Sequence, residues 1–118
     1  MPKKVMLVDD DRTLTSLIKT LLELDGYDAV IVSLATQVLP RARAEHPDAI
    51  VMDVHLADGD GLGVLRELRA SPDLQALPVI MASGMDLEDQ CREAGASDFI
   101  LKPYPPDHLT TAIQKALS

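Results

Sequence analysis

The apolar residues of the chain gather in five short, continuous runs. The runs occupy residues 5–8, 29–32, 49–52, 79–82 and 99–101 and contain no charged residue. Strands that are covered on both faces of a parallel sheet have continuous apolar runs, whereas strands with one face in water alternate between apolar and polar residues. The pattern therefore predicts five buried parallel strands.

The segments between these runs are expected to be helical. The expected helices cover about 14–22, 36–45, 62–68, 87–94 and 109–117, and the first has the apolar stripe Leu14, Leu17, Ile18, Leu21 and Leu22. Such a stripe is typical of a helix that packs one face on a sheet. Pro40 fits the second helix only in or near its first turn, because proline lacks the amide hydrogen that later turns need. Gly26, Pro72 and Gly95 stand where helices should end.

Regular alternation of strand and helix predicts the α/β class, with parallel strands joined by right-handed crossovers. For five strands we expect a flavodoxin-like three-layer sandwich with strand order 2-1-3-4-5 and five helices. The length of 118 residues is that of one domain, which we take to be residues 1–118. Ligands of this architecture bind beyond the carboxyl ends of the strands, beside the first strand.

Composition narrows the classes of function. The net charge of −8, with no stripe of Lys and Arg, argues against direct binding to nucleic acid. No apolar run is long enough for a membrane span, and the start of the chain lacks the pattern of a signal peptide. The single cysteine, Cys91, cannot form an internal disulfide, which favours the reducing cytoplasm.

Polar residues follow the strands at the edge where a ligand would bind. Asp9 and Asp10 follow the first run, Asp53 the third, Ser83 the fourth and Lys102 the fifth. Carboxylates crowded at one edge repel one another unless a cation lies between them. Because the expected ligands are oxygens with no His or Cys cluster, they suit Mg²⁺, or Mn²⁺, rather than Zn²⁺.

The same edge has the groups that phosphoryl transfer needs. Lys102 offers a cation to a phosphoryl oxygen, and the Ser83 hydroxyl can donate a hydrogen bond to another. A carboxylate can act as the nucleophile and form an aspartyl phosphate. Asp53 is the best candidate, because it stands alone after the central strand and faces both the acidic pair and the lysine.

These residues stand in four segments that together resemble a known family. The segments are VDDD at 8–11, DVHLADGDG at 53–61, MASG at 81–84 and AGASDFILKP at 94–103. In this order they resemble the receiver domains of two-component response regulators, of the chemotaxis-regulator type, over essentially the whole chain. The resemblance implies that Asp53 is the phosphoacceptor and Asp10 a direct Mg²⁺ ligand assisted by Asp9, with the backbone carbonyl of His55 completing the protein ligands.

The resemblance also implies a switch and a set of partners. Ser83 would move toward the new phosphoryl oxygens and Phe99 would turn inward, which changes the surface around the fourth helix, fifth strand and fifth helix. The Lys102–Pro103 bond would be cis. The donor would be a phosphohistidine on a histidine kinase or phosphotransfer protein, and the output a downstream protein, an output domain outside these residues or a phosphorylation-dependent dimer. Such a domain is a regulator that assists its own phosphorylation and dephosphorylation, not an enzyme.

Two other hypotheses fit part of the sequence. Residues 9–13 match the DxDxT signature of haloacid-dehalogenase-like phosphatases, in which Asp9 would be the nucleophile and Asp11 the general acid. That hypothesis gives Asp53 no role. The other hypothesis is a receiver-like interaction module that is never phosphorylated, and the complete set of Asp53, Ser83 and Lys102 argues against it.

Overall fold

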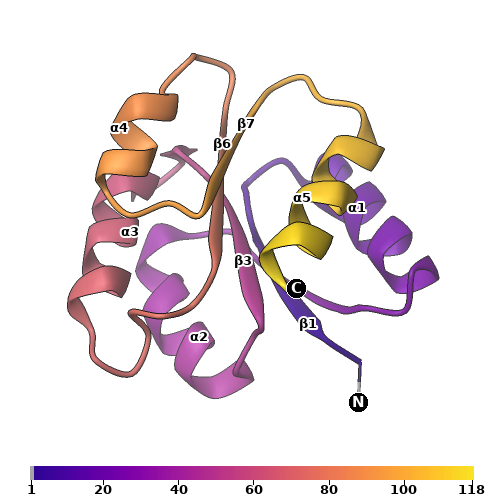
Figure 1. Cartoon of the computed structure of the whole chain (residues 1–118), viewed down its shortest axis with the longest axis horizontal. Coiled ribbons are helices and arrows are strands. Elements are labelled where there is room, and N and C mark those ends of the chain that lie inside the picture. The colour runs from indigo at the N-terminus through magenta and orange to yellow at the C-terminus, as the bar shows by residue number, and fades with distance from the viewer. Residues whose placement is uncertain (1) are drawn as a thin grey trace.

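The structure, a computed structural model, describes residues 2–118. Five parallel strands form the central sheet in the order β2-β1-β3-β6-β7 (Figure 1). Their bounds are Lys4–Val8 for β1, Asp28–Val32 for β2, Ala49–Asp53 for β3, Val79–Ser83 for β6 and Asp98–Leu101 for β7. Counted along the chain, this is the order 2-1-3-4-5, so the predicted flavodoxin-like sheet is confirmed.

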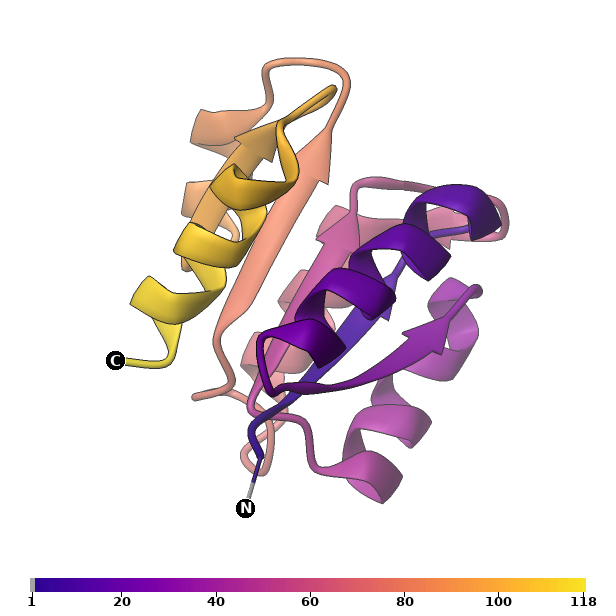
Figure 2. The same ribbon diagram turned by 90° about the vertical axis from the view of Figure 1, so that its right-hand side faces the viewer.

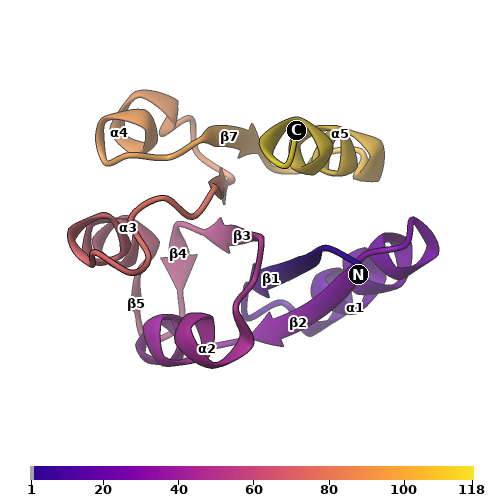
Figure 3. The same cartoon turned by 60° about the horizontal axis from the view of Figure 1, so that its bottom comes forward.

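Five α-helices cover the two faces of the sheet. They are α1 (Arg12–Leu24), α2 (Val38–Glu45), α3 (Gly61–Ala70), α4 (Glu88–Glu93) and α5 (Pro106–Ala116), and a 3₁₀ turn, η1 (Ala35–Gln37), precedes α2. Helices α1 and α5 lie on one face (Figure 2), and α2, α3 and α4 lie on the other (Figure 3). Within residues 2–118, no helix combines the length and the apolar character that crossing a membrane requires.

The sheet separates two hydrophobic cores. Along β1, Val5 and Leu7 pack toward α1 and α5, whereas Met6 and Val8 pack toward α2, α3 and α4. Alternate residues of a strand point to opposite faces, so each apolar run supplies side chains to both cores. This accounts for the continuous runs in the sequence.

The predicted helix boundaries agree with local backbone chemistry. The Asp11 carboxylate accepts a hydrogen bond from the backbone N–H of Leu14 and so caps the start of α1. Gly26 and Gly95 follow the ends of α1 and α4 with φ values of 89° and 107°, a left-handed conformation that glycine adopts readily. Pro40 is the third residue of α2 and therefore lies in its first turn, where a missing amide hydrogen costs little.

One residue of the apolar stripe predicted for α1 lies outside the core. The side of α1 that faces the sheet consists of Thr15, Ile18 and Leu22, whereas Leu17 is 51% exposed. Thr15 fits in the core because its hydroxyl donates to the backbone carbonyls of Asp11 and Arg12, which leaves no unsatisfied polar group. Leu14 also packs against this core, so the observed stripe keeps Leu14, Ile18 and Leu22 of the prediction and has Thr15 in place of Leu17.

A small hairpin between β3 and α3 was not predicted. Strands β4 (His55–Leu56) and β5 (Gly59–Asp60) pair antiparallel, apart from the main sheet. Asp60 then caps α3 by accepting a hydrogen bond from the backbone N–H of Leu62. Strands of two residues have too few positions to show an alternating pattern, so periodicity cannot reveal them.

Candidate functional site

Three side chains from strand ends meet at the carboxyl edge of the sheet. Asp9 directly follows β1, Asp53 is the last residue of β3, and Lys102 directly follows β7. The Lys102 Nζ lies 2.7 Å from Oδ2 of Asp9 and 3.2 Å from Oδ2 of Asp53. The acidic and basic side chains therefore meet at the carboxyl ends of the strands, beside β1, as predicted.

Asp10 joins these groups to form an acidic cluster. Asp9, Asp10 and Asp53 each offer one carboxylate oxygen, and these oxygens all lie within 4.8 Å of one another. The side chains of Asp9 and Asp53 are only 11% and 12% exposed, whereas Asp10 is exposed. A set of hard oxygen donors at the edge of solvent, with neither His nor Cys among them, fits Mg²⁺, which usually keeps several of its waters.

Hydrogen bonds hold the largely buried carboxylates of Asp9 and Asp53 in place. The second oxygen of Asp9, Oδ1, accepts from the backbone N–H of Asp11 at 3.0 Å. Oδ1 of Asp53 accepts from the backbone N–H of His55 at 3.3 Å. Each carboxylate thus has one oxygen on a backbone amide and the other on Lys102, so both are oriented by the fold while lone pairs remain free for a metal ion.

Lys102 stays charged in this environment. Burial lowers its pKa, but the hydrogen bonds and the electrostatic attraction from Asp9 and Asp53 outweigh burial and raise the pKa above its ordinary value of 10.5. The Lys102–Pro103 peptide bond is cis, the conformation that the family resemblance implies. The lysine is therefore a permanent cation beside Asp53 at neutral pH.

Ser83 and Phe99 lie on the two neighbouring strands β6 and β7. Ser83 ends β6 and is fully buried, and its Oγ accepts a hydrogen bond from the backbone N–H of Met85 at 3.0 Å. Because the Ser83 oxygen is the acceptor in that bond, the hydroxyl hydrogen can still be donated to another group. Phe99 is half-buried on β7, opposite Met81, and packs against the core on the α2–α4 side. The switching roles expected for Ser83 and Phe99 stay predictions.

His55 lies in β4, two residues after Asp53, with its side chain exposed. Its backbone N–H is the group that touches the Asp53 carboxylate. The metal contact expected from its backbone carbonyl stays a prediction, but the position of the residue beside the acidic cluster is compatible with it.

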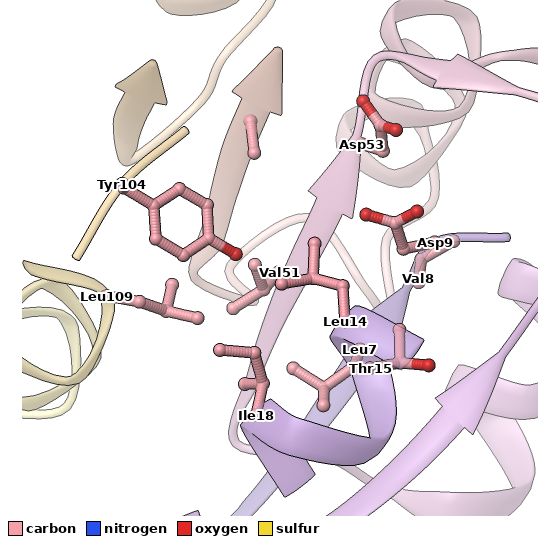
Figure 4. Close-up of a pocket in the computed structure, with 11 residues that line it drawn as sticks. Leu7, Val8, Asp9, Leu14, Thr15, Ile18, Val51, Asp53, Tyr104 and Leu109 are labelled. Carbon is pink, nitrogen blue, oxygen red and sulfur yellow. The ribbon is translucent and has the colours of Figure 1, made fainter. Parts of the chain in front are cut away.

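Tyr104 is a neighbour of the site that the sequence reasoning did not assign. A cavity of about 20 Å³ lies beneath the acidic cluster, between the sheet, α1 and α5, and its lining includes Asp9, Asp53, Thr15, Leu109 and Tyr104 (Figure 4). Burial, the largest effect, raises the pKa of the Tyr104 phenol. The scarcity of aromatic residues, only Tyr27, Phe99 and Tyr104, was the one sequence signal that could have singled it out.

Comparisons with known proteins agree with this geometry. The family model of the response regulator receiver domain matches residues 5–114. The alkaline phosphatase synthesis transcriptional regulatory protein PhoP of Bacillus subtilis is 34% identical over 120 residues, which cover 99% of this chain and 49% of that protein. The chain thus spans about half the length of the curated relatives that it matches.

Solved structures that are similar to this chain are also receiver domains. The receiver domain of a sensor histidine kinase from Pseudomonas aeruginosa, with a magnesium ion coordinated in its active site cleft, superposes with a TM-score of 0.89 at 28% identity and covers 99% of this chain and 98% of that one. The beryllofluoride-activated N-terminal receiver domain of RstA from Klebsiella pneumoniae has a TM-score of 0.87 at 28% identity, covering 98% of each chain. With the matched family model, these likenesses show that the chain belongs to the response regulator receiver domain family.

Proposed function

We propose that residues 1–118 act as one receiver unit of a two-component phosphorelay, and that Asp53 accepts the phosphoryl group. The observation that carries this proposal is the meeting of Asp53, the acidic pair and Lys102 at one partly open edge. Membership of the receiver family gives the class of reaction, and the geometry supports the choice of residue. Asp53 is the carboxylate of the cluster that ends the central strand, and it contacts the lysine directly.

In the proposed reaction, a carboxylate oxygen of Asp53 forms a bond to phosphorus while the bond from phosphorus to a histidine nitrogen of the donor breaks. The leaving imidazole then takes a proton from solvent. Lys102 stabilises negative charge on one transferring oxygen, and the Ser83 hydroxyl donates to another. Mg²⁺, held by Asp9, Asp10, Asp53 and the His55 carbonyl, with Mn²⁺ as a substitute, would neutralise further charge on the phosphoryl oxygens.

Phosphorylation would then change the surface of the domain. Phe99 on β7 pairs with Met81, two residues before Ser83 on β6, and we propose that a shift of Ser83 toward the phosphoryl group lets the aromatic ring turn inward. The strands and helices that follow, α4, β7 and α5, form the surface that changes. We propose that this surface binds a downstream protein, an output domain outside these residues or a second copy of the chain.

The same site would set the lifetime of the signal. A receiver assists hydrolysis of its own aspartyl phosphate with the groups that assist its formation, and we propose this activity for the present chain. The donor is a histidine kinase or a histidine phosphotransfer protein, and the proposed compartment is the cytoplasm, where a single unpaired cysteine stays reduced.

The phosphatase hypothesis has weaker support. In that mechanism Asp11 must be free to act as general acid, yet its side chain caps α1 by accepting from the backbone N–H of Leu14. It also needs Asp9 as nucleophile, and Asp9 is the carboxylate that lies closest to Lys102, at 2.7 Å. Asp53, which that mechanism leaves without a role, is one of the three carboxylates of the cluster and contacts Lys102 at 3.2 Å.

Intact-mass measurement tests the proposal directly. With Mg²⁺ and a small phosphodonor such as phosphoramidate, we expect the parent protein to gain the mass of one phosphoryl group. Asp53→Asn should remove this gain, whereas Asp11→Asn should retain it, since Asp11 only caps a helix. An unlabelled parent, or labelling that depends on Asp9 and Asp11 but survives Asp53→Asn, would refute the assignment.

A further inference from the structure

The hairpin that follows Asp53 is tied to a distant part of the chain at its tip. Asp58 lies in the turn between β4 and β5, and its carboxylate reaches the start of η1. Oδ1 accepts from the backbone N–H of Ala35 at 2.6 Å, while Oδ2 accepts from the backbone N–H of Thr36 at 3.2 Å and from its hydroxyl at 3.1 Å. One exposed side chain thus joins the loop after β3 to the loop after β2.

Close packing and hydrogen bonds hold this bridge in place. Gly59 packs closely on η1, because an added Cβ would lie 3.2 Å from the Cβ of Ala35. The backbone N–H groups of Ala35 and Thr36 lie in the first turn of η1, where they have no partner within the helix, so a carboxylate is their natural acceptor. Their hydrogen bonds with Asp58 hold its pKa below the ordinary value, the bond from Ala35 having the largest effect.

The rest of the segment is held by backbone hydrogen bonds at its two ends and by one buried side chain between them. The backbone N–H of Val54 donates to the carbonyl of Ala82 at 2.9 Å, and the backbone N–H of Gly61 donates to the carbonyl of Val54 at 2.7 Å. Leu56 is buried in the core on the α2–α4 side. His55 lies in β4, and its partner strand β5 begins directly after the tip that Asp58 holds.

We propose that Asp58 is a positioning residue for the metal site, because it fixes the tip of the hairpin that carries His55, whose backbone carbonyl is the expected Mg²⁺ ligand. This inference rests on the proposed function, in which that carbonyl is a ligand. Mg²⁺ demands near-ideal octahedral geometry, so a carbonyl on a loosened hairpin binds it less well. Loss of a residue that orients a ligand typically weakens metal binding by about tenfold to a hundredfold.

The test is a calorimetric Mg²⁺ titration of the folded protein and of matched variants. We expect Asp58→Ala to weaken Mg²⁺ binding by about tenfold, the lower end of the range for orienting residues. Asp58→Asn should stay within about threefold of the parent, because its amide oxygen can still accept from Ala35 and its NH₂ can donate to the Thr36 hydroxyl. Asp73→Ala is the control, since Asp73 is another exposed loop carboxylate that accepts a hydrogen bond, from Arg43.

The pair of variants at position 58 separates positioning from charge. Both variants remove one negative charge, but Asp58→Asn loses only the bond from the Thr36 backbone N–H, whereas Asp58→Ala loses all three hydrogen bonds. Equal weakening in Asp58→Ala and Asp58→Asn would overturn the inference, because it would mean that the carboxylate acts only through its long-range charge. Unchanged affinity in Asp58→Ala would overturn it as well.

The same experiments distinguish failure of the proposed function from failure of the role proposed for Asp58. A parent protein that binds no Mg²⁺ and takes no phosphoryl group would refute the proposed function itself. If the parent binds Mg²⁺ and is labelled while Asp58→Ala behaves like the parent, the function stands and only the role of Asp58 falls. Should Asp58→Ala not fold, Thr36→Val gives the test, because it removes one of the three hydrogen bonds and should weaken Mg²⁺ binding while Asp73→Ala does not.

Discussion

Lys102→Met is the substitution that probes the site most directly. Methionine is close to lysine in length and keeps the apolar stem, but it removes the cation that contacts Asp9 and Asp53. In the absence of metal, the two carboxylates would then face each other without a counter-charge. We expect the variant to be less stable than the parent without Mg²⁺ and to bind Mg²⁺ more tightly.

The magnitude follows from distances and burial. Breaking a fully buried ion pair by removing one partner costs about 3–5 kcal/mol. Here the side chains of Lys102, Asp9 and Asp53 remain 22%, 11% and 12% exposed, so solvent screening reduces the expected loss to about 1–3 kcal/mol. Two unit charges 4 Å apart in water interact by about 1 kcal/mol, and Mg²⁺ carries two. Because salt screening reduces the resulting value of about 2 kcal/mol to about 1.4 kcal/mol, removing the lysine should strengthen Mg²⁺ binding by about tenfold.

The assay is chemical denaturation, monitored by circular dichroism, with EDTA and again with Mg²⁺. The free energy of unfolding of Lys102→Met should lie below that of the parent with EDTA, and the difference should shrink by about 1.4 kcal/mol in saturating Mg²⁺, the equivalent of tenfold tighter binding. Lys115→Met, at an exposed position of α5, is the control for loss of one positive charge. Phosphoryl labelling of Asp53 should be slower than in the parent for Lys102→Met but not for Lys115→Met.

Two results would refute this reasoning. One is an unfolding free energy of Lys102→Met that equals that of the parent with EDTA, since the lysine would then contribute nothing to the metal-free site. The other is weaker Mg²⁺ binding, because it would mean that Lys102 orients the carboxylates rather than competing with the ion.

Further predictions concern packing, reactivity and pH. Gly61→Ala should lower the free energy of unfolding by about 1–3 kcal/mol, because the added Cβ would overlap the backbone carbonyl oxygen of Asp53; denaturation curves measure this, and an unchanged midpoint would contradict it. Cys91 is fully buried, and burial raises its thiol pKa, so iodoacetamide should modify it no faster than the protein unfolds. Asp73 has a pKa below its ordinary 3.8, chiefly through its hydrogen bond with Arg43. The stability that this pair contributes is therefore present above about pH 4 and is lost as the pH falls through the lower pKa of the folded state. Asp73→Asn should lessen the dependence of the unfolding free energy on pH in that range.

Much of the fold could be predicted because several local signals agreed. The continuous run before Asp53 predicted a central strand buried on both faces, and the strand is β3. The glycines at 26 and 95 marked helix ends because few other residues tolerate the left-handed backbone found there. In such cases the residue type alone restricts the backbone, so no knowledge of tertiary contacts is needed.

Other features depend on contacts that a sequence pattern does not contain. Leu17 was expected to face the core and Thr15 was not, because hydrophobicity ignores the hydrogen bonds by which a threonine can satisfy its hydroxyl within a helix. Asp58 looked like an ordinary turn residue, and its hydrogen-bond partners lie more than twenty positions earlier in the chain. The place of Tyr104 beneath the acidic cluster depends on how α5 packs against α1 and the sheet.

The contact between Lys102 and Asp9 joins residues that are 93 positions apart. During synthesis, the amino-terminal aspartates leave the ribosome long before the lysine does, so an incomplete chain carries the acidic pair without its counter-charge. Only a chain that has closed its last strand onto the sheet has the full set of groups. If Lys102 assists phosphoryl transfer as proposed, truncated or half-folded copies would take up the phosphoryl group more slowly than the complete fold, so efficient signalling is tied to completion of the fold.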